Sequence, residues 1–161
     1  MKTVFANHSE VCSAWAKQEQ RFGRAGNITF DGVTIKSYGW WPMAKFITPN
    51  VVLFRDETYS PSTGQHQSIV SSVIRHCKTT FHVVSMDLEH GANVKHYIAK
   101  MRKNADRFWQ SQNSTRWCYL GWVKVAAEAK AYCNYFGCND LLPALFGLEL
   151  LGPKAKAKLE N

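Results

Sequence analysis

The chain contains several stretches in which apolar side chains recur every three or four residues, a spacing typical of amphipathic helices. The first stretch follows Asn7 and Ser9, either of which is suited to cap a helix, and Gly23 and Gly26 follow its end. The side chains at helical spacing within it are Val11, Trp15, Gln18 and Phe22. We therefore predict a first helix over residues 8–22.

The segment NITFDGVTIK alternates apolar and polar residues, as expected of a β-hairpin with one buried face. Its Asp-Gly pair at 31–32 is the predicted two-residue loop, because this dipeptide favours the tight turns of hairpins. That loop pairs Phe30 with Val33 across the hairpin. It pairs Ile28 with Ile35 in the same way and places all four side chains on the buried face.

The remaining patterns predict further strands and helices. Strands are expected at residues 42–47, 51–55 and 80–86. Ser62, with Gln65 three residues later, is suited to cap a second helix. The inner stripe of that helix comprises His66, Ile69, Val70, Val73, Ile74 and Cys77. C-terminal helices are predicted at residues 92–111, 114–136 and 140–151.

Together these elements predict one α+β domain over residues 1–153. It has an N-terminal helix, a four- or five-stranded, mainly antiparallel sheet with an inserted helix, and a C-terminal helical layer. Residues 154–161, KAKAKLEN, form a basic tail. The chain has 161 residues, of which 45% are hydrophobic, and this is enough for a packed globular unit.

The balance of basic and acidic residues gives the first indication of a partner. Twenty lysines and arginines stand against twelve aspartates and glutamates, which gives a formal net charge of +8. This balance favours a polyanion or an acidic protein surface as the partner. A basic surface that serves solubility alone is the alternative.

Cysteine spacing and hydropathy indicate in which compartment of the cell the protein is expected. The chain has five cysteines and no Cys-x-x-Cys pair, which predicts neither a disulfide framework nor a zinc knuckle and fits a reducing cytosol. Polar residues 7–10 interrupt the N-terminal apolar run in a way that a signal peptide would not tolerate. The longest apolar segment, residues 141–151, is too short to cross a bilayer. We therefore expect neither export by that route nor a membrane span.

The helix predicted over residues 92–111 separates its side chains most clearly. At about 100° per residue, one side is apolar and comprises Val94, Tyr97, Ile98, Met101, Ala105 and Phe108. The far side carries a cationic ridge, which comprises His96, Lys100, Lys103 and Arg107. Such a ridge fits a phosphate backbone or an acidic protein face, and a solvated helix face is the alternative. Arg116, Lys124 and Lys130 of the next helix are candidates to extend it.

The segment YGWWP at residues 38–42 is a second candidate surface. Pro42 cannot donate a hydrogen bond to a central strand, so we expect the segment at a strand junction. The adjacent Trp40 and Trp41 point in opposite directions in an extended chain, which predicts one ring in the core and one on the surface. The outer ring, with Tyr38 beside it, would stack on bases or anchor a protein partner.

Candidates for catalysis are weaker. Ser62 and His66 lie one helical turn apart and permit a hydroxyl nucleophile with a base, but a cap and an inward-facing side chain explain them better. The histidines and cysteines lack metal-site spacing, and no glycine-rich phosphate loop is present, so no metal and no cofactor are expected. Trp117 and Trp122 in the C-terminal helices favour a protein partner or a second copy of the chain over nucleic acid.

Four motifs follow one another within residues 5–75. They are a Trp-Ala-x-Gln helix, an Asn-x-x-Phe-x-Gly hairpin, a Ser-Tyr-Gly turn and a Tyr-Ser-x-Ser-Thr-x-x-His segment. In this part the chain resembles a group of small accessory proteins of tailed bacteriophages. The resemblance implies a phage protein made in the bacterial cytoplasm, which counters host defence or takes over host nucleic-acid machinery. It implies no enzymatic activity.

Three functional hypotheses follow. The first is a non-enzymatic phage accessory protein that binds a host nucleic-acid-handling or defence complex, such as a CRISPR effector, and inhibits or redirects it. Its partner would be a host protein or ribonucleoprotein with an acidic surface. The binding residues would be the cationic ridge with Arg116, Tyr38, Trp40 and Trp41. The second hypothesis is direct DNA or RNA binding by the basic helix, and the third is a small hydrolase or transferase around Ser62 and His66.

Overall fold

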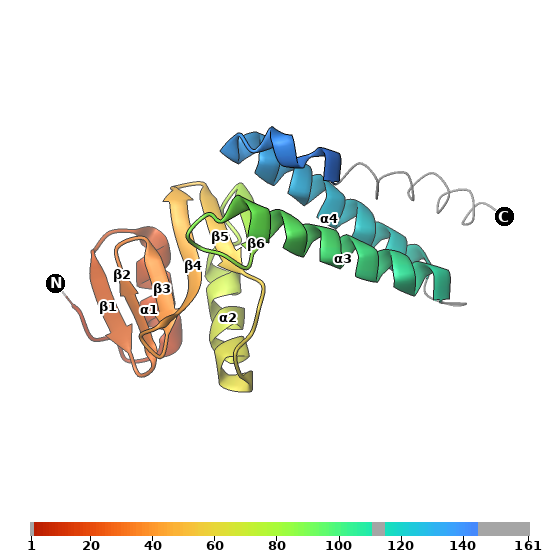
Figure 1. The fold of residues 1–161 in the computed structure, drawn as a ribbon. Helices are drawn as coiled ribbons and strands as arrows, with labels where there is room; N and C mark the ends of the chain where they lie inside the picture. Colours follow the sequence, from red (N-terminus) through yellow and green to blue (C-terminus); the bar gives the residue numbers. More distant parts are fainter. Residues whose placement is uncertain (1, 111–114, 145–161) are drawn as a thin grey trace. The chain divides into compact units, whose positions relative to one another are not determined.

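The computed structural model describes residues 2–110 and 115–144, which form an α+β arrangement of helices and one sheet (Figure 1). The helices are α1 (His8–Lys17), α2 (Pro61–Val73), α3 (His90–Gln110), α4 (Thr115–Phe136) and the short 3-10 helix η1 (Asn139–Leu141). The strands are β1 (Phe22–Ala25), β2 (Ile28–Asp31), β3 (Thr34–Ser37), β4 (Trp41–Thr48), β5 (Val51–Arg55) and β6 (Thr79–Val83). The predicted α+β class is confirmed, but the sheet has six strands rather than four or five.

The chain divides into two compact units, Met1–Asp87 and the part from Leu88 onward. The first unit contains α1, α2 and the whole sheet. The second unit contains α3, α4 and η1. The prediction of one domain over residues 1–153 stays a prediction.

The strands lie in the order in which they follow one another along the chain, from β1 at one edge to β6 at the other. The strands from β1 to β5 pair antiparallel. Strands β5 and β6 run parallel, because α2 lies between them and carries the chain back to the other end of the sheet. The sheet is therefore mixed, and its inserted helix follows β5.

Strand β1 was not predicted from the sequence. The first helix ends at Lys17 rather than at residue 22, because Gln18 takes a left-handed φ of 53° and caps it. Gly23, which we took as a helix stop, lies within the strand. A Cβ at this position would clash with the ring of Phe30, so glycine is needed for that ring to lie against β1.

The hairpin formed by β2 and β3 has a different register from the predicted one. Phe30 lies opposite Ile35, which leaves Gly32 and Val33 as the two-residue loop. Gly32 adopts a φ of 54° at the first loop position, a conformation that glycine takes without strain. Val33 is exposed as a result, whereas Ile28, Phe30 and Ile35 are buried as predicted.

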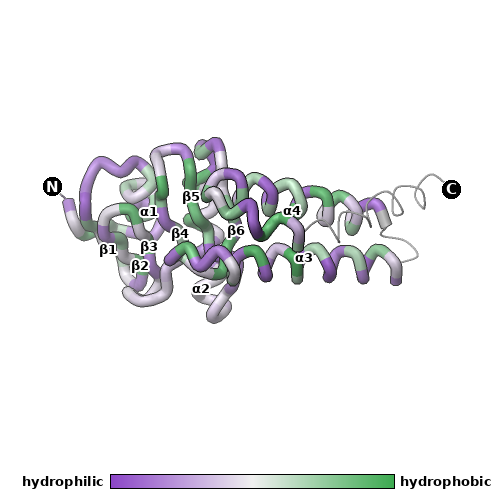
Figure 2. The backbone as a smooth tube through the Cα atoms, turned by 45° about the horizontal axis from the view of Figure 1, so that its top comes forward, coloured by the Kyte–Doolittle hydropathy of each residue, from purple (hydrophilic) through white to green (hydrophobic). Residues whose placement is uncertain are grey.

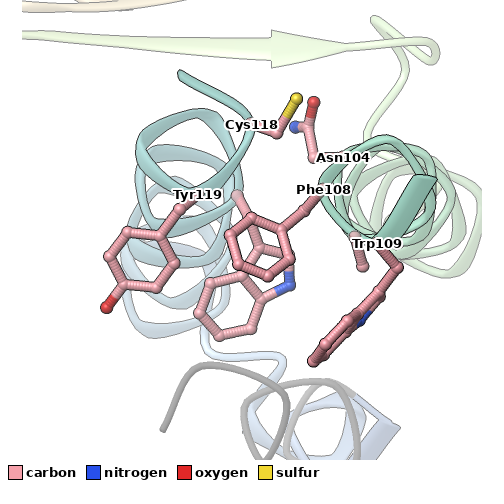
Figure 3. A pocket seen from close by; sticks show the side chains of 7 residues that line it. Asn104, Phe108, Trp109, Cys118 and Tyr119 are labelled. Carbon is pink, nitrogen blue, oxygen red and sulfur yellow. The ribbon is translucent and has the colours of Figure 1, made fainter. Parts of the chain in front are cut away.

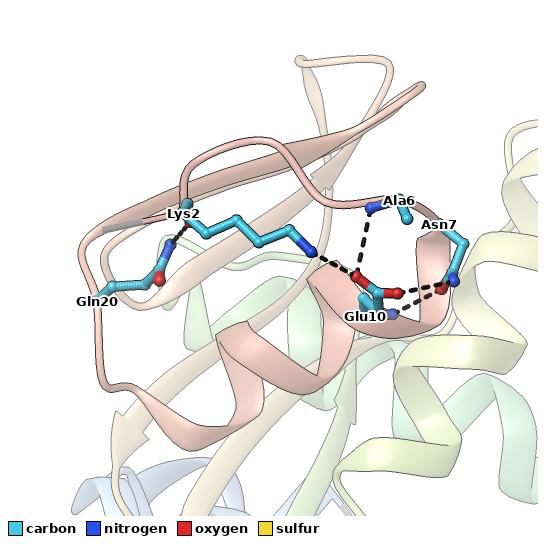
Figure 4. Close-up of polar contacts among 5 residues, drawn as sticks. All are labelled: Lys2, Ala6, Asn7, Glu10 and Gln20. Atoms are coloured by element: carbon cyan, nitrogen blue, oxygen red, sulfur yellow. Dashed lines mark hydrogen bonds and ion pairs between the residues drawn. The ribbon is translucent and has the colours of Figure 1, made fainter.

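Helix α1 begins at a cluster of polar contacts (Figure 4). Asn7 is the N-cap, and its side-chain oxygen accepts a hydrogen bond of 2.9 Å from the Glu10 N–H. The Glu10 carboxylate accepts hydrogen bonds from Lys2 Nζ at 3.0 Å and from the Ala6 N–H at 3.3 Å. These contacts, led by that of Lys2, lower the pKa of Glu10. The predicted cap at Asn7 is confirmed.

Helices α1 and α2 contact each other and cover one face of the sheet (Figure 1). The core between these helices and the strands comprises Val11, Cys12, Trp15, Ala25, Ile28, Phe30, Ile35, Met43, Ala44, Phe46, Val52, Val70 and Ile74. Trp15 is fully buried there, and its ring centroid lies 4.7 Å from that of Phe46. The first unit is thus a sheet held to two helices by one continuous core.

In the second unit, α3 and α4 pack along each other. Hydrophobic and hydrophilic positions alternate along α3 (Figure 2). The buried residues of α3 are Asn93, Val94, Tyr97, Met101, Ala105 and Phe108. They confirm the predicted apolar side, except that Ile98 is only half-buried. Helix α4 ends as predicted before Gly137, which has a φ of 69°.

The end of the chain is described only in part. The last predicted helix, residues 140–151, overlaps η1 at its start, and residues 145–151 lie outside the described residues. The predicted basic tail at 154–161 lies outside them as well.

A small cavity lies between α3 and α4 (Figure 3). Its lining residues are Asn104, Ala105, Phe108, Trp109, Cys118, Tyr119 and Trp122. The cavity volume is about 10 Å³, enough for about one water molecule. It is therefore a packing defect of the helix pair and too small to bind a substrate.

Candidate binding surfaces

The cationic ridge lies on the side of α3 away from its buried residues. Lys103 and Arg107 are exposed, and His96 and Lys100 are half-buried. The separation of charged and apolar sides that the sequence predicted is therefore present in the structure. The role of these side chains in binding stays a prediction.

Lys95 and Arg102 broaden this surface, and both are exposed. With Lys103 and Arg107 they border an open trough of about 730 Å³ along the helix, here called the α3 trough. Its lining residues are Lys95, Ile98, Ala99, Arg102, Lys103, Asp106, Arg107 and Gln110. Lys95 and Arg102 were not predicted as part of this surface, although their seven-residue spacing places them on one edge of the same polar side.

The α3 trough is strongly positive. Its lining includes four lysine or arginine side chains and one acidic residue, Asp106. On the helix surface, the cationic side chains of Lys95, Arg102 and Lys103 stand next to the small side chain of Ala99, so an anionic group placed there meets several positive charges.

A second exposed surface of the same unit lies along α4. Trp117, Leu120 and Val123 are exposed by 79%, 47% and 39%, and their three-residue spacing places them on one side of the helix. We call these three residues the α4 stripe. Arg116 and Lys124 are exposed beside it. Neighbouring apolar side chains that face solvent are typical of a surface that contacts another protein.

The first three residues of the YGWWP segment, Tyr38–Trp40, form the turn between β3 and β4, and Trp41 and Pro42 begin β4. Tyr38 and Gly39 take left-handed φ values of 54° and 76° in this turn. Trp40 is 55% exposed, which confirms the predicted outer ring. Trp41 is half-buried and packs against the core rather than within it, so the predicted inner ring is found only in part. Tyr59 was not predicted to join this surface; it is 63% exposed, and its ring centroid lies 5.0 Å from that of Trp40.

His66 and Ser62, the two residues of the predicted catalytic pair, make hydrogen bonds to two different residues. His66 Nδ1 lies 2.7 Å from Ser37 Oγ, whereas Ser62 Oγ lies 2.9 Å from the Tyr38 hydroxyl. The N-cap of α2 is Ser60 rather than Ser62. Because Ser37 is fully buried, a substrate has no access to the hydroxyl that contacts the imidazole. The geometry gives the hydrolase or transferase hypothesis no support.

The environment of His66 predicts that the stability of the first unit depends on pH. Burial, followed by the neighbouring His8, lowers the pKa of His66. The unfolded chain therefore binds a proton more readily than the folded one, so stability is retained above about pH 6.5 and is lost as the pH falls through the lower folded pKa. Urea unfolding of the chain at several pH values should show this loss, and His66→Gln should remove it. An identical pH dependence in both proteins would contradict the assignment to His66.

Among residues 2–110 and 115–144, no group of three or more histidine, cysteine or acidic side chains lies close enough together to hold a metal ion. None of the helices described combines the length and apolar character needed to cross a bilayer. The five cysteines are unpaired, and burial raises the pKa of Cys12 and Cys133 to about 12, so these two thiols stay protonated at neutral pH.

Comparisons of the chain with protein-family models, curated proteins and solved structures gave no match. The resemblance of residues 5–75 to phage accessory proteins therefore stays a prediction. The candidate binding surfaces of the described residues are the α3 trough, the α4 stripe and the aromatic residues near Trp40.

Proposed function

We propose that the protein is a non-enzymatic accessory factor that binds an acidic partner through the α3 trough. The observation that carries the proposal is the charge of this trough. Lys95, Arg102, Lys103 and Arg107 are exposed around it, and Asp106 is the one acidic residue in its lining. Charge of this density accelerates encounter with a negative surface and fixes the orientation of the complex.

The α4 stripe supports a protein as the partner. Protein interfaces combine a core of aromatic and aliphatic side chains with a charged rim, and Trp is among the residues that contribute most to binding energy. Trp117 is 79% exposed, and the exposed Arg116 precedes it directly. A polyanion alone would gain little from Leu120 and Val123.

The biological setting of the proposal comes from the sequence. The motifs of residues 5–75 resemble phage accessory proteins, which act inside the bacterial cell. We therefore propose a host nucleic-acid-handling or defence complex as the partner, a CRISPR effector being one example. Binding there would inhibit or redirect the complex, because an acidic surface that normally contacts a basic partner would be covered.

Direct DNA or RNA binding is the second candidate. The observation that favours it is the near absence of acidic side chains from the α3 trough. A phosphate backbone needs only positive charge, and each phosphate contact makes the affinity depend on salt. Salt dependence therefore separates the two candidates.

Reversing the charge of the trough should abolish binding. The triple variant Arg102→Glu, Lys103→Glu and Arg107→Glu replaces exposed side chains, so we expect an intact fold and a loss of affinity of about 100-fold or more. The measurement is capture of partners from bacterial lysate by the full chain, with and without nuclease, followed by titration of the captured partner at several salt concentrations.

A matched control keeps the same change in net charge. Lys17→Glu, Arg75→Glu and Lys78→Glu alter exposed positions of the first unit and should leave binding unchanged. Capture that disappears with nuclease and falls steeply and linearly with salt on logarithmic axes would favour direct nucleic-acid binding. Equal capture by both triple variants would reject the α3 trough.

A further inference from the structure

Three aromatic rings of the first unit, two of them exposed, pack against one another and are here called the aromatic platform: Trp40, Trp41 and Tyr59. The ring centroids of Trp40 and Tyr59 lie 5.0 Å apart at an interplanar angle of 84°, and those of Trp41 and Tyr59 lie 5.5 Å apart. Trp40 and Trp41 are 5.6 Å apart at 79°. Trp40 and Tyr59 are more than half exposed, so the rings present unused π surface to solvent.

Helix α2 fixes the turn that carries Trp40. The Tyr38 hydroxyl lies 2.9 Å from Ser62 Oγ, and its ring lies 5.7 Å from that of His66. Tyr38 holds a φ of 54°, which costs a non-glycine residue free energy and persists where surrounding contacts enforce it. The turn is therefore held in place before any partner binds.

The same helix fixes the loop that carries Tyr59. Gln67 is 5% exposed, and its side-chain nitrogen donates hydrogen bonds of 2.9 Å to the backbone oxygens of both Arg55 and Glu57. Its side-chain oxygen accepts a hydrogen bond from the Thr58 hydroxyl at 2.9 Å. Because both loops are already held by α2, a ligand that binds the platform loses little free energy to the ordering of these loops.

The chemistry around the platform favours a cation. The Arg55 guanidinium already stacks on the Trp41 ring, 4.5 Å from its centroid. It also lies 3.7 Å from the Glu57 carboxylate, so the local positive charge is balanced. Glu57 remains more than half exposed and can accept hydrogen bonds from a second cation.

We propose that the aromatic platform binds a basic, extended segment of a partner protein. An arginine or lysine of that segment stacks on the exposed faces of Trp40 and Tyr59 and pairs with the Glu57 carboxylate. The proposal is independent of the α3 trough, since it concerns the other unit and a ligand of opposite charge. A rigid, aromatic surface of this kind is typical of domains that bind extended peptides.

The test uses the full chain and a synthetic peptide of alternating arginine and proline, which is extended and basic. We expect the peptide to change tryptophan fluorescence on titration. Trp40→Ala, Tyr59→Ala and Glu57→Gln should each weaken binding by about tenfold. Phe22→Ala removes another exposed aromatic ring of the same unit and should leave binding unchanged. The chain's net charge of +8 disfavours non-specific attraction of a basic peptide.

A peptide with citrulline in place of arginine keeps the shape but loses the charge. We expect it to bind about tenfold more weakly, because stacking of a neutral group lacks the cation–π attraction. Equal binding of both peptides, or no binding of the arginine peptide at millimolar concentration, would overturn the proposal. Binding of single-stranded DNA or of an oligosaccharide that Trp40→Ala abolishes, in place of the peptide, would also overturn it.

Discussion

Trp15→Ala is expected to destabilise the first unit by about 3–5 kcal/mol, the usual cost of removing a large aromatic side chain from a packed core. Trp15 is fully buried in α1 and packs on Phe46 of β4, so its ring joins the helix layer to the sheet. Its replacement by alanine leaves a cavity that the backbones of α1 and β4 cannot close. A loss below about 1.5 kcal/mol would show that the site collapses around alanine.

Trp15→Phe serves as the control for this prediction. The indole Nε1 of Trp15 is buried and has no hydrogen-bond acceptor among the residues that the structure describes, so phenylalanine removes no polar contact that the structure shows. We expect it to cost about 1–2 kcal/mol, less than the alanine replacement. Hydrogen exchange of the β2 and β3 amides measures the stability of this unit directly, without interference from the lost tryptophan fluorescence.

Local signals in the sequence predicted the cap of α1, the buried side of α3 and the end of α4, but not the end of α1 or the cap of α2. The cap at Asn7 needs only a side-chain oxygen and the N–H three residues later, both contained in one short segment. The buried side of α3 follows from the fixed rotation of about 100° per residue. The end of α4 before Gly137 needs only a residue that accepts a left-handed φ.

The sheet was harder to predict because its details depend on distant residues. A hairpin register shifted by two residues keeps the same side chains on the buried face, so alternation cannot separate the two registers. The observed register places Ser37 opposite Ile28, where it is buried against His66, 29 positions away in the chain. Gly23 looks like a helix stop until the ring of Phe30 is placed beside it.

The two candidate surfaces also differ in whether local sequence patterns predict them. The positive side of α3 follows from periodicity, but the predicted ridge left out Lys95 and Arg102 and included His96 and Lys100, which are half-buried and do not line the α3 trough. The aromatic platform joins Trp40 to Tyr59 through contacts of two separate loops with α2. No local pattern in the sequence predicts that Gln67 holds the second loop, since a glutamine on a helix is ordinarily solvated.

Tyr132→Ala should destabilise the second unit by about 3–5 kcal/mol, and Tyr132→Phe by about 1–3 kcal/mol. Tyr132 is fully buried in α4. Its hydroxyl accepts a hydrogen bond of 2.8 Å from Asn93 Nδ2 and lies 2.9 Å from His90 Nδ1. The Tyr132 hydroxyl, which accepts from Asn93 and contacts the His90 imidazole, therefore joins two polar side chains of α3.

The phenylalanine variant isolates the hydroxyl from the ring. It keeps the packing of Tyr132 against Tyr97 and Phe136, whose ring centroids lie 5.7 Å and 4.7 Å away, but it removes a partner of the fully buried Asn93. Hydrogen exchange of the α4 amides measures the loss, and Tyr135→Phe, at a position exposed by 45%, should change it by no more than about 0.5 kcal/mol. If Tyr132→Phe were as stable as the unaltered chain, the hydroxyl would contribute nothing, and packing alone would join α3 to α4 at this point.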